Sequence, residues 1–311
     1  VRFHHCDLPP SDLKRGGFFL PDGLDGQFVM WLATARNARY WRRPHGAGPM
    51  SRALILFLVF LVSGAVEAIA APCTDQFLKG SPPTDPHRYT TLLCYKQFAD
   101  LYSAQTKTPL WAAEHLTVER LEKAARLRPL DPAPFHLEDQ IPSYDGSTLA
   151  DYHSAGAVYD RGHMAPSNDM PDAESQFNSF TLSNIVPQAA CNNEVIWNGV
   201  EAATRSLATT DGEVYVVTGP IFDGFPIDTI GKNGVAVPTR LFKAIFDPAQ
   251  NGAGVYVTRN VNGDQTWREI SVADLKGLTG IDAFPALPDG VKSAAWPLPP
   301  PELLRQACRV N

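Results

Sequence analysis

Positive charge is scarce in this chain of 311 residues, which carries 27 Lys and Arg against 33 Asp and Glu. The first 71 residues hold 8 of the basic and 5 of the acidic side chains, so residues 72–311 have 19 against 28 and a formal net charge of −9. A chain with this balance has no general basic field that would attract nucleic acid. A polyanion would therefore have to bind through a local cluster of arginines and a bound cation.

The chain also lacks an unbroken apolar run of the ~20 residues that a membrane-spanning helix needs. Its run at Ala53–Val62 follows Met50–Arg52 and is succeeded by the small residues of Ala68–Ala71. A short basic start, an apolar core and a small-x-small ending are typical of a secretory signal peptide. This interpretation is favoured over a transmembrane anchor, so we expect no stable membrane anchor.

These features divide the chain into three parts. We expect translation to begin at Met50, which makes 1–49 a mistranslated or disordered leader and 50–71 the signal peptide. Residues 72–311 would form one domain, because no internal repeat and no long linker interrupts them. The mature protein is expected to be secreted or periplasmic.

Cysteine is scarce as well, with five in the chain, of which Cys6 falls in the leader. No C-x-x-C or H-x-x-x-H spacing occurs among the remaining candidates, which disfavours a zinc site. Four cysteines in an exported chain predict two disulfides, for which three connectivities exist. Cys73–Cys94 closes the local loop and is the favoured pair, which leaves Cys191–Cys308.

Periodicity of the apolar residues predicts a chain of mixed strands and helices. Strands are expected at Pro109–Leu116, Phe177–Gln188, Gly212–Phe222, Val235–Phe246 and Val255–Thr258. Helices are expected in Leu92–Leu101, Asn193–Leu207 and Ser271–Leu275. Thr117 and Ser271 are the predicted N-caps of helices that follow them.

The densest group of chemically active residues lies in Tyr159–Pro166, where a histidine stands beside a guanidinium and a carboxylate. About thirty positions later, Asn193, Trp197, Glu201 and Arg205 follow at steps of four residues, which is one face of a helix. An imidazole base, an oxygen ligand for a hard metal and phosphate-binding arginines together indicate metal-assisted phosphodiester hydrolysis. The plainer alternative is an ordinary amphipathic helix with Trp197 in the core.

Each of three side chains suits one part of that reaction. His163, whose ordinary pKa lies near neutrality, suits the general base. Asn193 offers a neutral oxygen, which fits Mg²⁺ because this ion keeps several waters and needs few protein ligands. Glu201 would accept hydrogen bonds from those waters.

Arginines would supply the positive charge that a phosphate requires. Arg161 would hold phosphate, and Arg205 would add charge to the same helix face. Upstream, Arg126 and Arg128 lie in a basic, proline-rich passage. Either a phosphate contact or a solvated helix end explains them.

The segment Asp160–Pro166, the run Ser183–Gln188 and the helix face from Asn193 to Arg205 resemble the DNA/RNA non-specific endonucleases, the ββα-metal or His-Me finger family. The similar region extends over roughly Trp111–Pro288. The resemblance implies a mixed α/β fold in which helices flank an antiparallel sheet and a ββα-metal element carries the site.

The resemblance also implies roles for individual residues. A base would deprotonate water, one asparagine would be the sole direct protein ligand of Mg²⁺, with Mn²⁺ as a substitute, and a glutamate would order the water shell. The implied catalytic residues are His163, Arg161, Glu201, Asn184 and Arg128, and the implied metal ligand is Asn193.

Two functions of different class are therefore compared. The first is an exported nuclease that cleaves DNA and RNA, and the second is a catalytically inactive relative that binds nucleic acid. The presence of His163, Asn193, Glu201 and Arg161 favours the first. The sequence leaves open the preference between DNA and RNA, an inhibitor protein as a partner, and a homodimer.

Overall fold

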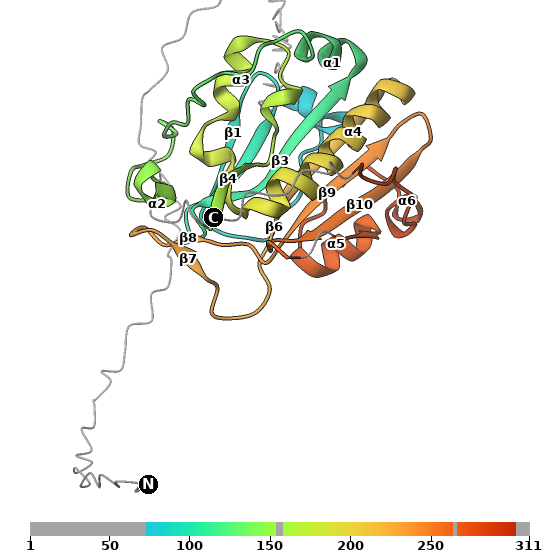
Figure 1. Cartoon of the computed structure of the whole chain (residues 1–311). Coiled ribbons are helices and arrows are strands. Elements are labelled where there is room, and N and C mark those ends of the chain that lie inside the picture. The colour runs from blue at the N-terminus through green and yellow to red at the C-terminus, as the bar shows by residue number, and fades with distance from the viewer. Residues whose placement is uncertain (1–72, 154–157, 264–265, 303–311) are drawn as a thin grey trace, which may run out of the picture. The chain divides into compact units, whose positions relative to one another are not determined.

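The computed structural model describes residues 73–153, 158–263 and 266–302, and its centre is a seven-stranded sheet whose neighbouring strands are all antiparallel (Figure 1). Across the sheet the strands follow the order β1-β2-β3-β6-β9-β10-β11. Their bounds are β1 Thr90–Cys94, β2 Ala99–Ser103, β3 Thr108–Thr117, β6 Glu213–Ile221, β9 Arg240–Asp247, β10 Gly252–Arg259 and β11 Trp267–Ile270.

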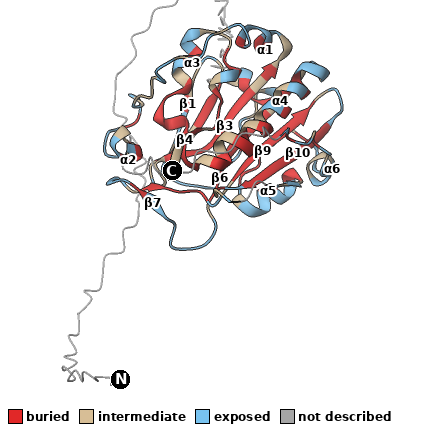
Figure 2. Ribbon diagram, viewed as in Figure 1, coloured by how far each residue is buried: buried red, intermediate tan, exposed pale blue. Residues whose placement is uncertain are grey.

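Both faces of the sheet are covered by other elements. In β6, Val214 and Val216 belong to the apolar cluster on one face, whereas Tyr215 and Val217 belong to the cluster on the other. This alternation follows from the two-residue period of a strand. The inner strands are consequently buried over most of their length, and the exposed surface lies on the outer sides of the helices and on the loops (Figure 2).

Helix α4 (Asn198–Asp211) crosses the face to which Val214 points, and α1 (Val118–Ala124) lies beside it (Figure 1). The predicted cap Thr117 is confirmed, since its side chain accepts a hydrogen bond from the Arg120 amide. Helix α4 ends at Asp211, and the next residue, Gly212, has a φ of 102°, a backbone conformation that favours glycine. Between α1 and α4 the chain forms α2 Leu149–His153, β4 Tyr159–His163, η3 Ser167–Asp169, α3 Ala173–Ser179, η4 Leu182–Asn184, β5 Ile185–Ala189 and the π-helix η5 Asn192–Trp197.

The opposite face is covered by α5 and by the first turns of the described chain. Val272 and Leu275 of α5 pack in the same cluster as Phe77 and Val255. The predicted cap Ser271 is confirmed and forms a capping box with the first turn of α5. The remaining elements are η1 Thr74–Gln76, η2 Leu78–Gly80, β7 Thr229–Ile230, β8 Val235–Ala236, α5 Val272–Thr279 and α6 Asp289–Ser293.

A disulfide joins Cys73 to Cys94, with 5.5 Å between the two Cα atoms. The favoured pairing is thereby confirmed, and it attaches the turns before η1 to the end of β1. For the second predicted pair, Cys191 is buried, and Cys308 lies outside the described residues.

Two sequence-based expectations for local structure are wrong. Residues Leu92–Leu101 form an antiparallel hairpin, β1–β2, in place of a helix. Leu93 is buried and Leu92 is exposed, so the stretch follows a two-residue period that its apolar spacing did not distinguish. Of the strand expected at Phe177–Gln188, the chain forms only β5, because the first residues complete α3.

The expected fold class, a mixed α/β architecture with an antiparallel sheet flanked by helices, is confirmed. The predicted leader at 1–49 and signal peptide at 50–71 lie outside the described residues. Among the helices of the described part, none has the length and apolar character needed to span a bilayer.

Candidate active site

The central motif lies on β4, which pairs with β5 so that His163 is opposite Ile185. On the other face of β4, Gly162 lies directly against Gln188. A Cβ atom added at Gly162 would sit 2.6 Å from the Cβ of Gln188, closer than real side-chain atoms approach. Position 162 therefore requires glycine, because the side chain of Gln188 on β5 comes too close for a Cβ atom.

Asn184, just before β5, holds the backbone that follows His163. Its Oδ1 accepts from the Ala165 amide at 2.8 Å, and its Nδ2 donates to the carbonyls of Ala165 at 2.9 Å and Ser179 at 2.8 Å. The side chain is fully buried and all its polar atoms are used. These contacts give Asn184 a positioning role for the backbone after His163, and the catalytic role that the resemblance implies stays a prediction.

The imidazole of His163 lies against two aromatic rings, with centroid distances of 5.5 Å to Phe135 and 4.9 Å to Phe180. Its Nε2 is completely buried and has no hydrogen-bond partner among the described residues. Burial, reinforced by the charge of Arg161, lowers the pKa of His163 to about 4. The ring is therefore neutral at neutral pH, which is the state that a general base requires.

Arg161 lies two residues before His163, on the same face of β4. Its guanidinium carbon is 4.2 Å from the centre of the Phe135 ring, a cation–π contact. Within the described part of the chain the guanidinium makes no hydrogen bond or ion pair, so its N–H groups remain available for an anion. Phe135 was missed by the sequence analysis because its proline-rich segment has no periodic pattern.

The helix expected from Asn193 begins as the π-helix η5 and continues as α4. Single π turns inside helices are frequent at functional sites, and they alter the spacing of the side chains. Gln188 donates to Oδ1 of Asn192 at 2.7 Å, and Asn192 donates to the Arg259 carbonyl at 2.8 Å. These buried bonds attach the first turn of the helix to β5 and β10.

Trp197 occupies the core, as the plainer interpretation of the helix expected. Its side chain is buried in a cluster with Met164 and Val186. The Nζ atom of Lys243 lies 5.5 Å from the centre of its ring. Trp197 therefore packs the helix against the core beneath β4 and β5. The polar residues of the same helix are the ones that can take part in a reaction.

Asn193 is oriented by Asp160, because its Nδ2 donates to Oδ2 of Asp160 at 3.0 Å. A carboxylate only accepts hydrogen bonds, so the amide nitrogen must face Asp160 and the amide oxygen must face away from it. Burial raises the pKa of Asp160, and the bond from Asn193 opposes this effect. Asp160 thus positions the amide oxygen that the sequence singled out as a metal ligand.

A cavity of about 140 Å³ brings three of the predicted site residues together, namely His163, Asn193 and Glu201. Glu201 makes no hydrogen bond with the described residues, and burial raises its pKa to about 7 against the lowering effects of Lys243 and Arg205. An amide oxygen and a carboxylate beside a neutral imidazole fit Mg²⁺, which prefers oxygen ligands and retains several waters.

Arg205 is held in a network of ion pairs and hydrogen bonds that the sequence did not reveal. Its Nη1 lies 3.0 Å from Oδ1 of Asp169. Arg120 donates to the Asp169 carbonyl at 2.8 Å and to Glu114 Oε1 at 2.6 Å. Burial raises the pKa of Glu114 to about 8, and Arg120 opposes this rise. Arg205 therefore contributes its charge beside Glu201 from a fixed position.

The upstream arginines are not brought to the cavity. Arg126 and Arg128 are exposed beyond the end of α1, and neither lines the space around His163. Arg126 lies within 3.9 Å of Glu122, four residues earlier. The more informative upstream signal was Glu114, a carboxylate within the apolar strand predicted at 109–116.

The antiparallel pair β4–β5 is followed by the helix η5–α4, with His163 on the first strand and Asn193 on the helix, which is the arrangement of a ββα-metal element. The chain belongs to the DNA/RNA non-specific endonuclease family, whose model matches residues 77–290.

Several relatives resemble part of the chain. Endonuclease G of Bos taurus, a mitochondrial protein, is 37% identical over 161 residues, which cover 49% of this chain and 52% of that protein. The mitochondrial nuclease EXOG of Danio rerio is 36% identical over 205 residues, covering 60% and 58%. Nuclease C1 of Cunninghamella echinulata is 30% identical over 224 residues, covering 65% and 86%. The chain thus matches only about half to three fifths of the mitochondrial relatives.

A solved structure shares the fold. The crystal structure of the EndoG/EndoGI complex, which concerns the mechanism of EndoG inhibition, has a TM-score of 0.59 and 27% sequence identity. The alignment covers 70% of this chain and 95% of that chain.

Proposed function

We propose that this protein is an exported, Mg²⁺-dependent endonuclease that hydrolyses phosphodiester bonds of both DNA and RNA. The observation that carries the proposal is the meeting of His163, Asn193 and Glu201 in one small cavity. Membership in the non-specific endonuclease family supports the substrate class. The site has the parts that hydrolysis of a phosphodiester requires, namely a base, oxygen ligands for a cation and a guanidinium, that of Arg161, which makes no hydrogen bond or ion pair with the described residues.

His163 is proposed to accept the proton of the attacking water at Nδ1. This nitrogen is chosen because Nε2 is completely buried and a water could not reach it. The low pKa keeps the ring unprotonated before the reaction. The contacts with Phe135 and Phe180 fix its orientation, so the base does not have to be ordered when the substrate arrives.

Asn193 is proposed to hold the cation through Oδ1, and Glu201 to accept hydrogen bonds from its waters. When bound, Mg²⁺ would stabilise the negative charge that develops on the phosphate and on the leaving oxygen. Arg161 would donate to a phosphate oxygen, since none of its N–H groups is used within the described residues. Arg205, bound to Asp169, would contribute positive charge without contacting the substrate.

Export is proposed from the signal-like sequence at 50–71 and is consistent with the Cys73–Cys94 disulfide, since such bonds persist in oxidising compartments. The relatives named above include mitochondrial proteins, so the proposed export is separate from the proposed nuclease activity and needs its own test. An inhibitor protein is a further candidate partner, because the related EndoG forms a complex with EndoGI.

The direct test incubates the purified protein with plasmid DNA and with RNA, in the presence of Mg²⁺ and after its removal by EDTA. Cleavage of both nucleic acids only with the metal is the expected result. Binding without cleavage under all metal conditions would instead support the inactive, nucleic-acid-binding alternative. His163→Ala, prepared in parallel, excludes a contaminating nuclease if it loses the activity.

A further inference from the structure

Lys243 is a buried basic residue in the middle of β9, and the proposed reaction does not use it. The residue is 1% exposed, although an ammonium group is strongly hydrated in water. Removing a charge from water is costly unless an opposite charge or several hydrogen bonds compensate it. The surroundings of Lys243 must therefore contain a compensating group.

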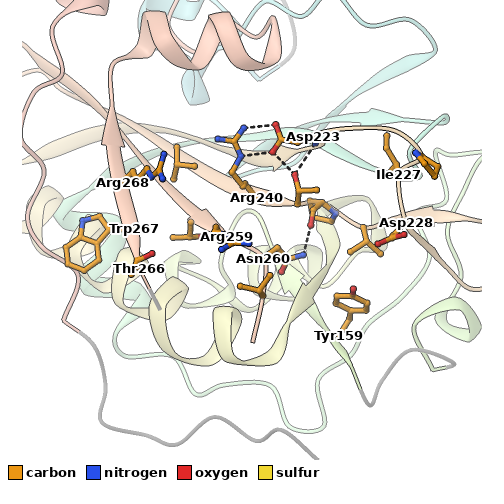
Figure 3. A pocket seen from close by; sticks show the side chains of 17 residues that line it. Tyr159, Asp223, Ile227, Asp228, Arg240, Arg259, Asn260, Thr266, Trp267 and Arg268 are labelled. Atoms are coloured by element: carbon orange, nitrogen blue, oxygen red, sulfur yellow. Dashed lines mark hydrogen bonds and ion pairs between the residues drawn. The ribbon is translucent and has the colours of Figure 1, made fainter. Parts of the chain in front are cut away.

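The other basic residue of β9, Arg240, has such a group directly beside it. It lies at the start of the strand, in a cleft of about 650 Å³ where Figure 3 shows it next to Asp223. Asp223 accepts two hydrogen bonds from the guanidinium, at 2.7 and 2.6 Å. Lys243 follows three residues later and therefore lies on the opposite face of the strand, which α4 covers. It makes no ion pair with any residue that the structure describes.

Two contacts hold the ammonium of Lys243 beneath the helix. Its Nζ donates to Oγ1 of Thr218, the residue opposite it on β6, at 2.7 Å. It also lies 5.5 Å from the centre of the Trp197 ring, a cation–π contact. An ammonium has three N–H donors and a full positive charge, so one hydroxyl and one ring do not neutralise it.

Lys243 belongs to a group of charged residues that act on one another between the sheet and α4. The group contains three carboxylates and three bases, namely Glu114, Asp169 and Glu201 with Arg120, Arg205 and Lys243. Four of these residues are paired directly. Arg120 donates to Glu114 at 2.6 Å, and Arg205 donates to Asp169 at 3.0 Å. One carboxylate and one base of the group therefore have no ion pair among the described residues, and these are Glu201 and Lys243.

The positions of Glu201 and Lys243 place them near each other. Glu201 follows Trp197 by four residues, so the two side chains lie on one face of the helix, one turn apart. Lys243 contacts the ring of Trp197 on that face. Burial raises the pKa of Glu201, and Lys243 is the strongest of the charges that lower it, ahead of Arg205 and against the effect of Asp169. Glu201 also lines the small cavity of the candidate site.

We propose that Lys243 is a positioning residue for Glu201, because it supplies the buried positive charge that compensates the Glu201 carboxylate at the edge of the cavity. A compensated carboxylate offers both of its oxygens as acceptors, which suits hydrogen bonds from the waters of a cation. Lys243 contacts neither substrate nor cation and acts only through Glu201. The inference rests on the proposed nuclease function and extends its machinery to a strand of the central sheet, outside the ββα-metal element.

The first experiment is a double-mutant cycle on stability, measured by urea unfolding of the full-length protein without metal. Lys243→Met removes the charge and keeps an unbranched apolar side chain, and Glu201→Gln removes the opposite charge. Lys243→Met should lower the urea midpoint of the wild-type protein, because it leaves a carboxylate uncompensated. The same substitution should cause about half of that loss or less in the Glu201→Gln background, since directly interacting residues are not additive.

A matched control is Glu122→Gln, which neutralises an exposed carboxylate on α1. In this background Lys243→Met should cause the same loss as in the wild-type protein. An equal loss in the Glu201→Gln and Glu122→Gln backgrounds would overturn the proposal. If Lys243→Met alone does not fold, a cooperative unfolding transition in its combination with Glu201→Gln supports the proposal, and the absence of that transition overturns it.

The second experiment measures kcat for plasmid cleavage in the same variants at saturating Mg²⁺. Lys243→Met should lower kcat about tenfold in the wild-type and Glu122→Gln backgrounds, a usual effect for a residue that supports a metal site from outside. In the Glu201→Gln background it should lower kcat about twofold or less. A tenfold loss in all three backgrounds would mean that Lys243 does not act through Glu201.

The two experiments separate this inference from the proposed function. If the wild-type protein cleaves neither DNA nor RNA, the proposed function is wrong. The stability cycle needs no activity, and in that case it alone decides whether Lys243 compensates Glu201.

Discussion

Burial gives His163 a pKa of about 4, and this property affects both turnover and stability. In the proposed reaction, a ring that is neutral at neutral pH is ready to accept a proton. In folding, the same burial opposes protonation of His163 in the native state, so acid lowers the free energy of unfolding. Variants at this one position therefore report on two different consequences of the same environment.

His163→Ala should lower kcat by about 10²–10⁴, the usual contribution of general acid–base catalysis. The fold should persist, because Asn184 holds the following backbone independently of the imidazole. Steady-state cleavage of DNA measures the effect, and circular dichroism checks the fold. His87→Ala, at an exposed histidine near β1, should retain the wild-type rate. A near-normal rate for His163→Ala would place the base elsewhere.

Stability should rise with pH between about 4 and 6.5, because the unfolded chain binds a proton at His163 in this window and the native chain does not. The native pKa is about 4 and the ordinary value is 6.5, so the contribution amounts to about 3 kcal/mol, present above pH 6.5 and lost by pH 4. Urea unfolding of the metal-free protein at several pH values measures it. His163→Gln, which does not titrate, should lose less stability on acidification; parallel curves for both proteins would contradict the assignment.

Asn193→Ala should lose activity through the metal, because one neutral oxygen ligand leaves little redundancy for an ion otherwise held by water and phosphate. Higher Mg²⁺, or Mn²⁺ in its place, should restore part of the rate. Glu201→Gln should be milder, since that residue is proposed to act through water. Metal titrations of activity separate the two variants. Wild-type metal dependence in Asn193→Ala would mean that this helix does not carry the cation.

At the scale of elements, the site depends on how the β4–β5 pair and the helix η5–α4 are held against the sheet. Gln188 and Asn192 connect β5 to the start of the helix, and Asn192 continues the connection to β10. On the other side of the cavity, Asp169 connects η3 to both α1 and α4 through Arg120 and Arg205. The cavity is therefore fixed by buried polar bonds between elements that are distant in sequence.

Asn184→Ala should destabilise the protein by about 3 kcal/mol, because it leaves buried backbone groups of Ala165 and Ser179 without partners. The turn after β4 would loosen, so kcat should fall as well. Chemical denaturation measures the stability, and a metal titration of activity shows how the rate is lost. If kcat falls while the Mg²⁺ concentration needed for half-maximal activity stays the same, Asn184 acts by positioning. If a higher Mg²⁺ concentration is needed, Asn184 has a role at the cation.

At the scale of the whole molecule, the charge distribution would decide where the proposed nucleic-acid substrate is held. Residues 72–311 carry a net charge of −9, so attraction must come from local clusters. Near the cavity, the charge of Arg161 acts on His163 and that of Arg205 acts on Glu201. An acidic balance in the rest of these residues would disfavour adsorption of nucleic acid elsewhere on the protein.

The protein recovered from the culture medium or periplasm should begin near Ala71 or Pro72, because the small-x-small ending of the apolar segment is a cleavage signal. It should also contain two disulfides and no free thiol. Intact mass before and after reduction measures both properties in one sample. Retention of Met50 would contradict cleavage of the signal, and reactive thiols under denaturing, non-reducing conditions would contradict the second pair.

Local patterns determined much of the architecture and the identity of the central site residues. The strand around Val214, the helix after Asn193 and the cap at Ser271 each depend on neighbouring residues, whose period or side-chain chemistry is visible in the sequence. The pairing of Cys73 with Cys94 followed from the short loop between them. Where the apolar spacing suited two periods, as in Leu92–Leu101, local information was insufficient, and pairing with β3 selected a strand.

Tertiary structure alone decided how the functional side chains are oriented and held. Asp160 and Asn193 are 33 positions apart, and Arg120 and Asp169 are 49 apart. Such pairs arise when separate elements bury their apolar faces together, and no local period encodes which polar groups then meet. The same packing used every polar atom of Asn184, left Arg128 away from the cavity and lowered the pKa of His163, because burial is a property of the assembled fold.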